Sequence, residues 1–225
     1  MEITYFISKK GRVLSFKKRL IVQRECIFMK LTREFYLENG VTLAKNLISK
    51  VLVHEAPEGI TKGIIVETEA YMGEMDDAAH SYKGKSERTN IQYGRGGFAY
   101  IYLIYGMHHC MNIVANIEDR PQAVLIRALE PLEGIELMML RRKTDKVNIL
   151  CNGPGKLCQA MGINKSHYGI DLCGFTMYLE EPNNSQPIDV IASKRINIDY
   201  AEQSKDNLWR FTKRDSKFIS AKLNM

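Results

Sequence analysis

The sequence predicts a single mixed domain of the α+β class, with helices flanking a β-sheet. The chain has 225 residues, of which 45% are hydrophobic and 26% are charged, and this suits one packed globular core. Alternating apolar residues predict strands within 63–71 and 98–114, a near-continuous apolar run predicts one at 123–129, and helical spacing occurs before and after these strands. No internal repeat, low-complexity tract or linker divides the body of the chain.

Residues 1–28 differ from the rest of the chain in charge. They hold seven Lys and Arg residues against two Glu, a net charge of +5 out of the total of +6. We interpret residues 1–28 as a basic arm or extension and residues 29–225 as the working domain. A nucleic-acid surface on that domain must then be a local patch, because its own net charge is only +1.

Several classes of protein are excluded. No run reaches the roughly 18–20 apolar residues of a membrane helix, and Lys and Arg interrupt the N-terminal apolar pieces, unlike a signal peptide. The five cysteines form no CxxC pair, which favours free thiols in a reducing compartment over disulfides or zinc. His108 and His109 are adjacent on an expected strand and point to opposite faces. We therefore expect no metal, no cofactor and no membrane partner.

The first elements of the domain are expected to be helical. Thr32 suits the N-cap of a helix that stops at Asn39–Gly40. Apolar residues at a spacing of four predict a second helix within 43–51. A short strand is expected at 51–54.

The strand predicted at 63–71 carries two glutamates among apolar residues. Glu67, Glu69 and Tyr71 fall on one face. Glu69 and Tyr71 would then sit side by side, roughly 6.5–7 Å apart. An edge strand with a solvated outer face explains the same pattern, and on this strand alone that interpretation is the simpler one.

A long polar loop is expected at 73–97. It mixes glycines with cations such as Arg88 and contains His80. Loops of this length are functional or disordered. Lys and Arg among glycines suit phosphate contacts, although a solvated loop has the same composition.

Residues 98–114 predict a β-hairpin with an unusual tip. Tyr100 and Tyr102 share one face, and Tyr105 is expected on the other. The turn at Gly106 has apolar neighbours where hairpin tips are normally polar. Such a tip either folds back on the core or forms a wedge of the kind that unstacks DNA bases. Asn112 on the return strand needs hydrogen-bond partners if it is buried.

The strand expected at 123–129 contains Arg127 among apolar residues. A buried guanidinium needs a carboxylate or phosphate, and Glu69 is the natural candidate. An Arg reaching to the sheet edge is the alternative. Pro131 is expected to open a helix ending at Lys143.

Three further cations are candidate DNA contacts. Lys156 lies in a Gly-rich segment before an expected helix at 157–161, a pattern that suits an anion site or plain helix capping. Lys194 follows an expected strand at 189–193. Arg214 lies in a mixed basic and aromatic segment that suits a nucleic-acid rim or a half-buried hairpin.

Six ordered motifs resemble the alkyladenine (3-methyladenine) DNA glycosylase family, over about residues 30–220. They are Val66-Glu-Thr-Glu-Ala-Tyr71, Ala79-His80-Ser81, Tyr100-Ile-Tyr-Leu-Ile-Tyr-Gly-Met107, Cys110-Met-Asn-Ile113, Arg127-Ala-Leu-Glu-Pro-Leu-Glu-Gly134 and Gly153-Pro-Gly-Lys-Leu-Cys-Gln-Ala160. The resemblance implies a curved antiparallel β-sheet with flanking helices and a protruding hairpin. It also implies base-excision repair of double-stranded DNA, with alkylated or deaminated purines removed from it.

The resemblance also implies a role for each matching residue. Glu69 would activate water, and Arg127 would hold that water and the carboxylate. Tyr71, His80 and Tyr102 would sandwich the flipped base. Stacking returns about 1–3 kcal/mol per base, which offsets a flipping cost of a few kcal/mol, and electron-rich rings favour cationic alkylated purines.

Other matching residues would contact the duplex or select the base. Asn112 would exclude guanine by crowding its exocyclic amine, and Tyr105 would fill the gap left in the duplex, beside Met107. His108 departs from the family pattern, in which a tyrosine occurs, and this affects the shape of the tip. No lysine stands among the implied pocket residues, so we expect hydrolysis without a Schiff base and an abasic-site product.

Two other functions stay open as alternatives. A lesion-binding protein would bind distorted DNA without releasing a base, and a nucleoside hydrolase would work without Tyr105. We expect the protein to be a monomer. In a bacterium, we expect it in the cytoplasm, associated with the nucleoid. In a eukaryote, we expect it in the nucleus.

Overall fold

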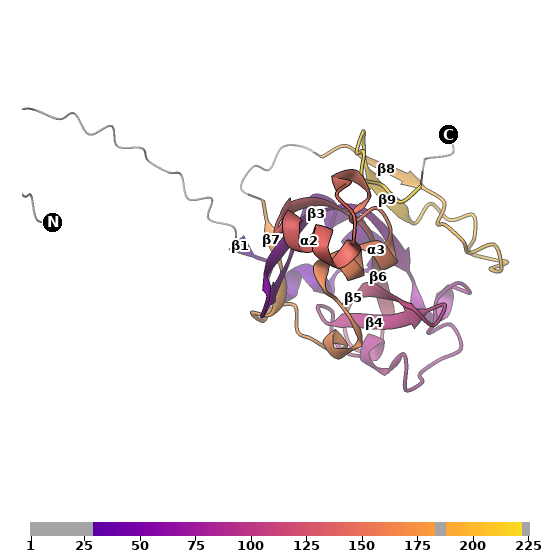
Figure 1. The fold of residues 1–225 in the computed structure, drawn as a ribbon. Coiled ribbons are helices and arrows are strands. Elements are labelled where there is room, and N and C mark those ends of the chain that lie inside the picture. Colours follow the sequence, from indigo (N-terminus) through magenta and orange to yellow (C-terminus); the bar gives the residue numbers. More distant parts are fainter. Residues whose placement is uncertain (1–28, 183–187, 222–225) are drawn as a thin grey trace, which may run out of the picture.

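The computed structural model describes residues 29–182 and 188–221, which form one α+β domain (Figure 1). The proposed N-terminal arm, residues 1–28, lies outside the described residues. Nine strands form one open, curved sheet, and every pairing among them is antiparallel. The strands are β1 (Met29–Lys30), β2 (Val51–Ala56), β3 (Gly59–Tyr71), β4 (Ala99–Ile104), β5 (His108–Ala115), β6 (Gln122–Glu133), β7 (Met177–Glu181), β8 (Val190–Ser193) and β9 (Arg210–Lys213).

Three helices pack on this sheet, namely α1 (Gly40–Asn46), α2 (Ile135–Arg142) and α3 (Pro154–Met161). Helices α2 and α3 contact each other, and α3 lies against β5 and β6 (Figure 1). Between sheet and helices lies one apolar core that includes Leu43, Ile126, Met138 and Leu157. In the described part of the chain, no helix is long and apolar enough to cross a membrane.

Strand β3 is the centre of the sheet because it pairs with three others. Its first half pairs with β2, residues 67–69 pair with β9, and β6 runs along the other edge. The β3–β6 register shifts around Glu67, as it does at β-bulges, which bend a strand. Both glutamates of β3 are fully buried. The solvated-edge interpretation of this strand is therefore wrong.

The first helical segment differs from expectation. Residues Arg33–Leu37 form a short 3-10 helix, and Asn39 begins a helix where it was expected to end one. The Asn39 side-chain oxygen accepts the N–H groups of Val41 and Thr42, both at 3.1 Å. Helix α1 ends at Asn46, so the helix predicted within 43–51 ends earlier than expected. The strand predicted at 51–54 is confirmed as β2.

Pro131 does not open a helix. Strand β6 continues through it to Glu133, and α2 begins only at Ile135. Pro131 lies opposite Gly63 next to a register shift, where a missing ladder hydrogen bond is tolerated. Helix α3 begins at Pro154, three residues earlier than predicted.

The predicted hairpin is confirmed as β4 and β5. Tyr105 and Gly106 at its turn both have positive φ, 53° and 70°, and the amide of Met107 donates to the carbonyl of Ile104 at 3.3 Å. The loop at 73–97 contains two short 3-10 helices, Gly73–Met75 and Asn90–Tyr93. The strand expected at 189–193 is β8.

Candidate active site

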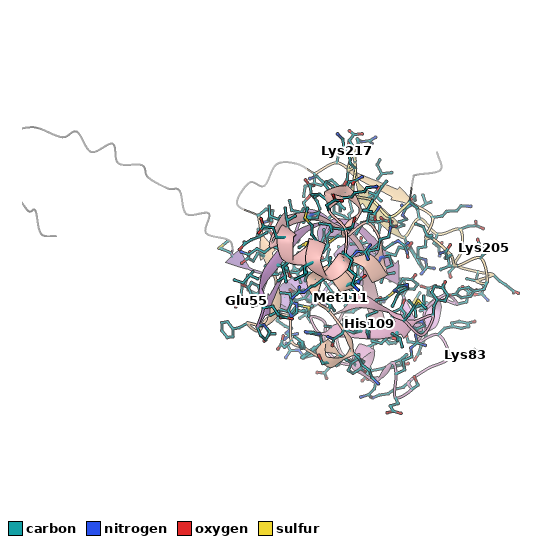
Figure 2. All side chains as sticks on the ribbon, in the orientation of Figure 1. Glu55, Lys83, His109, Met111, Lys205 and Lys217 are labelled. Carbon is teal, nitrogen blue, oxygen red and sulfur yellow. The ribbon has the colours of Figure 1, made fainter. Side chains whose placement is uncertain are left out.

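A cavity of about 420 Å³ opens where the β4–β5 hairpin meets β3, β6, the 73–97 loop and residues 196–200. Its volume lies in the range of about 300–1,000 Å³ that is typical of small-molecule sites. In Figure 2, Lys83 of the loop and Lys205 beyond residue 200 both project at the right-hand side of the molecule. The described residues contain no cluster of three or more His, Cys, Asp or Glu side chains that could hold a metal ion.

Glu69 lies directly behind the wall of this cavity. Its Oε1 accepts the amide of Ile196 at 2.7 Å, and its Oε2 accepts the Tyr71 hydroxyl at 3.0 Å and Arg127 Nη1 at 3.1 Å. The three donor residues line the cavity, whereas Glu69 is fully buried. Oε1 therefore retains acceptor capacity for one further donor, such as a water molecule.

The protonation of Glu69 is set by two opposing effects. Burial raises its pKa, because a desolvated carboxylate is disfavoured. Arg127, the Ile196 amide and the Tyr71 hydroxyl act in the opposite direction, and the pKa stays above its ordinary value. A base with a raised pKa is better matched to proton transfer near neutral pH.

The pair predicted between Arg127 and Glu69 is present, and it belongs to a larger buried cluster. Arg127 Nε also donates to Glu67 Oε1 at 3.1 Å, and Arg210 Nε donates to the same oxygen at 2.8 Å. Ser220 Oγ donates to Glu67 Oε1 at 2.8 Å. Two carboxylates and two guanidinium groups thus compensate each other, as buried charges require.

Aromatic side chains form much of the cavity wall. The His80 ring meets the Tyr102 ring edge to face, with centroids 4.6 Å apart. The Tyr100 ring lies 5.6 Å from that of Tyr102, and Tyr71 lines the same cavity. Strand β4 supplies both tyrosines from alternate positions, as predicted, so that they share one face.

His80 is held as a neutral imidazole. Arg88 Nη2 lies 3.1 Å from its Nε2 and can only donate, so Nε2 is the acceptor and we assign the proton to Nδ1, 2.8 Å from the Tyr100 hydroxyl. Partial desolvation by its neighbours and the charge of Arg88 lower the pKa of His80 to about 4, although the residue as a whole remains exposed. A neutral ring at this position does not repel a cationic ligand.

Asn112 of β5 is buried and lines the cavity. Its Nδ2 donates to the carbonyl of Tyr100 at 3.2 Å. The hydrogen bond expected for a buried amide is therefore present, and it fixes the side chain beside Leu125 of β6.

The hairpin tip is strongly exposed. Tyr105 is 79% exposed and Met107 70%. Tyr105 was expected on the face opposite Tyr102, but both residues line the cavity. The positive φ of Tyr105 ends the strand alternation, which explains this correction. His108 also lines the cavity and packs on Gly155, where an added Cβ would lie 3.1 Å from the His108 Cβ.

The predicted cations are distributed unevenly. Arg88 lines the cavity and lies over the Tyr102 ring, 5.0 Å from its centroid. Lys156, Lys194 and Arg214 do not border the cavity. Lys194 pairs with Asp206 at 2.6 Å and Arg214 with Asp189 at 2.5 Å, while Lys156 donates to the Asn152 side chain at 2.9 Å. Their contact with DNA stays a prediction.

Sequence reasoning missed three groups around Glu69. The Ile196 amide belongs to the backbone, which carries no residue-type signal. Arg195 and Asp76 form a buried pair beside the site. Arg195 follows an expected strand and could have been singled out only once its burial was known.

Comparisons with known proteins agree with this geometry. The family model for methylpurine-DNA glycosylase matches residues 34–217. A proposed 3-methyladenine DNA glycosylase of Clostridium tetani is 50% identical over 206 residues, covering 86% of this chain and 100% of that protein. Another, of Desulfitobacterium hafniense, is 48% identical over 202 residues, covering 86% and 99%. The chain therefore belongs to the methylpurine-DNA glycosylase family, whose members are DNA glycosylases for alkylated purines in base-excision repair.

Proposed function

We propose that the protein is a monofunctional purine DNA glycosylase that flips an alkylated or deaminated purine out of duplex DNA and hydrolyses its N-glycosidic bond. The buried Glu69 carboxylate behind an aromatic cavity is the observation that carries this proposal. A base inside the duplex is out of reach, so flipping must precede the chemistry. The family model and the relatives support the reaction class.

In the proposed step, water attacks C1′ of the damaged nucleotide while the bond from C1′ to the base nitrogen breaks. The proton of the water passes to Glu69, whose Oε1 has acceptor capacity left. The electron pair of the broken bond leaves with the base, so a cationic alkylated purine departs neutral, whereas hypoxanthine departs as an anion that takes up a proton from solvent. Arg127, 3.1 Å from Oε2, holds the carboxylate in place. The sugar passes through an oxocarbenium-like state, as in other glycoside hydrolysis.

Recognition of the base is assigned to the aromatic wall. We propose that Tyr71, His80 and Tyr102 stack on the flipped ring, and that Asn112 excludes guanine through its exocyclic amine. The neutral state of His80 supports this role, because a charged imidazole would add a second positive charge beside Arg88 and repel a cationic base. Arg88, Lys156, Lys194 and Arg214 are proposed DNA contacts. The bacterial relatives favour the nucleoid-associated location over a nuclear one, and we propose a monomer.

Product analysis tests this function. Wild-type protein and a duplex with one hypoxanthine or 3-methyladenine should yield the free base and an alkali-labile abasic site. Borohydride should trap no covalent complex, since a Schiff base is not formed. Tight binding without base release would favour a lesion-binding protein. Cleavage of free nucleosides at the same rate as the damaged duplex would favour a nucleoside hydrolase.

Tyr105→Ala should lower kcat/KM on duplex DNA by roughly ten-fold or more, because an exposed ring that fills the gap offsets part of an unstacking cost of a few kcal/mol. Leu208→Ala is the matched control, since Leu208 is an exposed apolar residue that does not border the cavity. Unchanged duplex activity in Tyr105→Ala would refute the gap-filling role.

The pH profile should report Glu69. The reaction needs its carboxylate form, so kcat/KM should rise with pH through the pKa of Glu69 and level off above it. Since burial raises that pKa, the midpoint should lie above the ordinary glutamate value of about 4.3. His80→Asn should leave this midpoint in place, because the pKa of His80 is about 4. A midpoint that follows His80 instead would contradict the assignment of the base.

A further inference from the structure

Asp76 and Arg195 form a buried ion pair behind the cavity. Arg195 Nη1 lies 2.6 Å from Asp76 Oδ2, Nη2 lies 2.8 Å from Oδ1, and both side chains are fully buried. Asp76 also accepts the amides of Met72 and Ala78 and the Ser204 hydroxyl. The carboxylate is thus firmly held, and it compensates the guanidinium charge.

The guanidinium of this pair lies over the ring of Tyr71, 4.8 Å from its centroid, and over Trp209 at 5.0 Å. Tyr71 lines the cavity, whereas Arg195 does not. The Tyr71 ring therefore separates the ion pair from the space in which a base would stack. Any charge left uncompensated behind the ring would act on that base through a poorly screened region.

We propose that Asp76 and Arg195 set the preference of the pocket between cationic and neutral purines, because together they form an ion pair without net charge behind the Tyr71 ring. This inference rests on the proposed function, in which Tyr71 stacks on the base. An Arg on a ring competes with a second cation for the same electron-rich system. Asp76 cancels the charge of that Arg and leaves the ring available to a cationic base.

The size of the effect follows from distance. A base stacked on Tyr71 would lie about 9 Å from the guanidinium, given ring spacings of about 4.5 Å. An uncompensated unit charge at that distance changes the affinity for a cation by roughly twenty-fold at an effective dielectric constant near 20. The affinity for a neutral base should change far less.

The test uses duplexes with a 2′-fluoro sugar, which resists glycosidic cleavage, at one 3-methyladenine (cationic) or one hypoxanthine (neutral). The measured quantity is the ratio of the two dissociation constants. Asp76→Asn leaves a positive charge behind the ring and should weaken binding of 3-methyladenine relative to hypoxanthine by roughly twenty-fold. Arg195→Gln leaves a negative charge and should shift the ratio in the opposite direction.

Two further variants separate charge from structural damage. The double variant Asp76→Asn, Arg195→Gln removes both charges and should restore the wild-type ratio to within about two-fold. Asp77→Asn is the matched control, because Asp77 neighbours Asp76 and accepts the amides of residues 202–204 without contacting Arg195. It should leave the ratio unchanged.

The proposal depends on opposite shifts of this ratio in the two single variants. A purely structural role would change the dissociation constants for both lesions in the same direction and leave their ratio unchanged. An equal ratio in Arg195→Gln and wild type would overturn it, even if Asp76→Asn fails to fold. A ratio in the double variant that matches Asp76→Asn would overturn it as well. If wild-type protein releases neither base from cleavable duplexes, the proposed function fails instead, and the two failures are distinguishable.

Discussion

Arg127→Met should lower the free energy of unfolding by about 3–5 kcal/mol, because it leaves buried carboxylates without their shared counter-charge. For a chain of this length, that corresponds to a fall in Tm of roughly 10 °C. The Glu69 carboxylate is destabilised most, because it loses its cationic partner Arg127. Glu67 keeps its ion pair with Arg210 at 2.8 Å. Thermal unfolding followed by circular dichroism measures the change.

The loss in Arg127→Met should depend on pH. Without Arg127, the folded-state pKa of Glu69 rises further above its unfolded value, so the folded protein binds a proton more tightly than the unfolded chain. Stability relative to wild type should then recover as pH falls through the raised folded-state pKa of Glu69 toward the unfolded value of about 4.3. Arg214→Met is the control, because Arg214 is exposed and pairs only at the surface, and its Tm should stay nearly unchanged. Equal Tm values for both variants would contradict a buried, charge-balanced cluster.

The central strands could be predicted from the sequence because their apolar patterns are clear. Strand β3 and the β4–β5 hairpin appear where alternation indicated them, and the first part of β6 appears where a near-continuous apolar run indicated it. Strands β1, β7 and β9 were not predicted, and the other errors lie at element ends, where competing local contacts decide. Asn39 caps the helix that follows it, and Pro131 continues β6 at a register shift.

The chemistry of the site could be predicted in part. Arg127 and Glu69 were paired correctly because each is a charge in an apolar strand, and burial demands a partner. The role of Glu67 was not foreseen, because its partners Arg210 and Ser220 come from the distant C-terminal segment. Only tertiary packing brings these groups together.

The position of Tyr105 shows a further limit of periodicity. Strand alternation assigned it to the face opposite Tyr102, but the turn conformation at Tyr105 returns it to the cavity. The Ile196 amide and the Asp76–Arg195 pair are likewise set by a segment without regular structure. Residue spacing carries no information about such a segment.

Glu69→Gln should lower the rate of base release by about 10³-fold, within the roughly 10²–10⁴-fold range of general-base catalysis. The amide has nearly the shape of the carboxylate but cannot accept the proton of the attacking water. The cavity wall is unchanged by this substitution, because Glu69 itself does not border the cavity. Binding of a damaged duplex should therefore be retained.

The most direct test compares single-turnover release of hypoxanthine from one duplex by wild type, Glu69→Gln and Glu67→Gln, each at saturating concentration. Glu67→Gln is the matched control, since it removes a carboxylate from the same buried cluster and leaves Glu69 in place. The account predicts a loss of about 10³-fold in Glu69→Gln alone, with about ten-fold or less in Glu67→Gln. Equal rates in wild type and Glu69→Gln would contradict it.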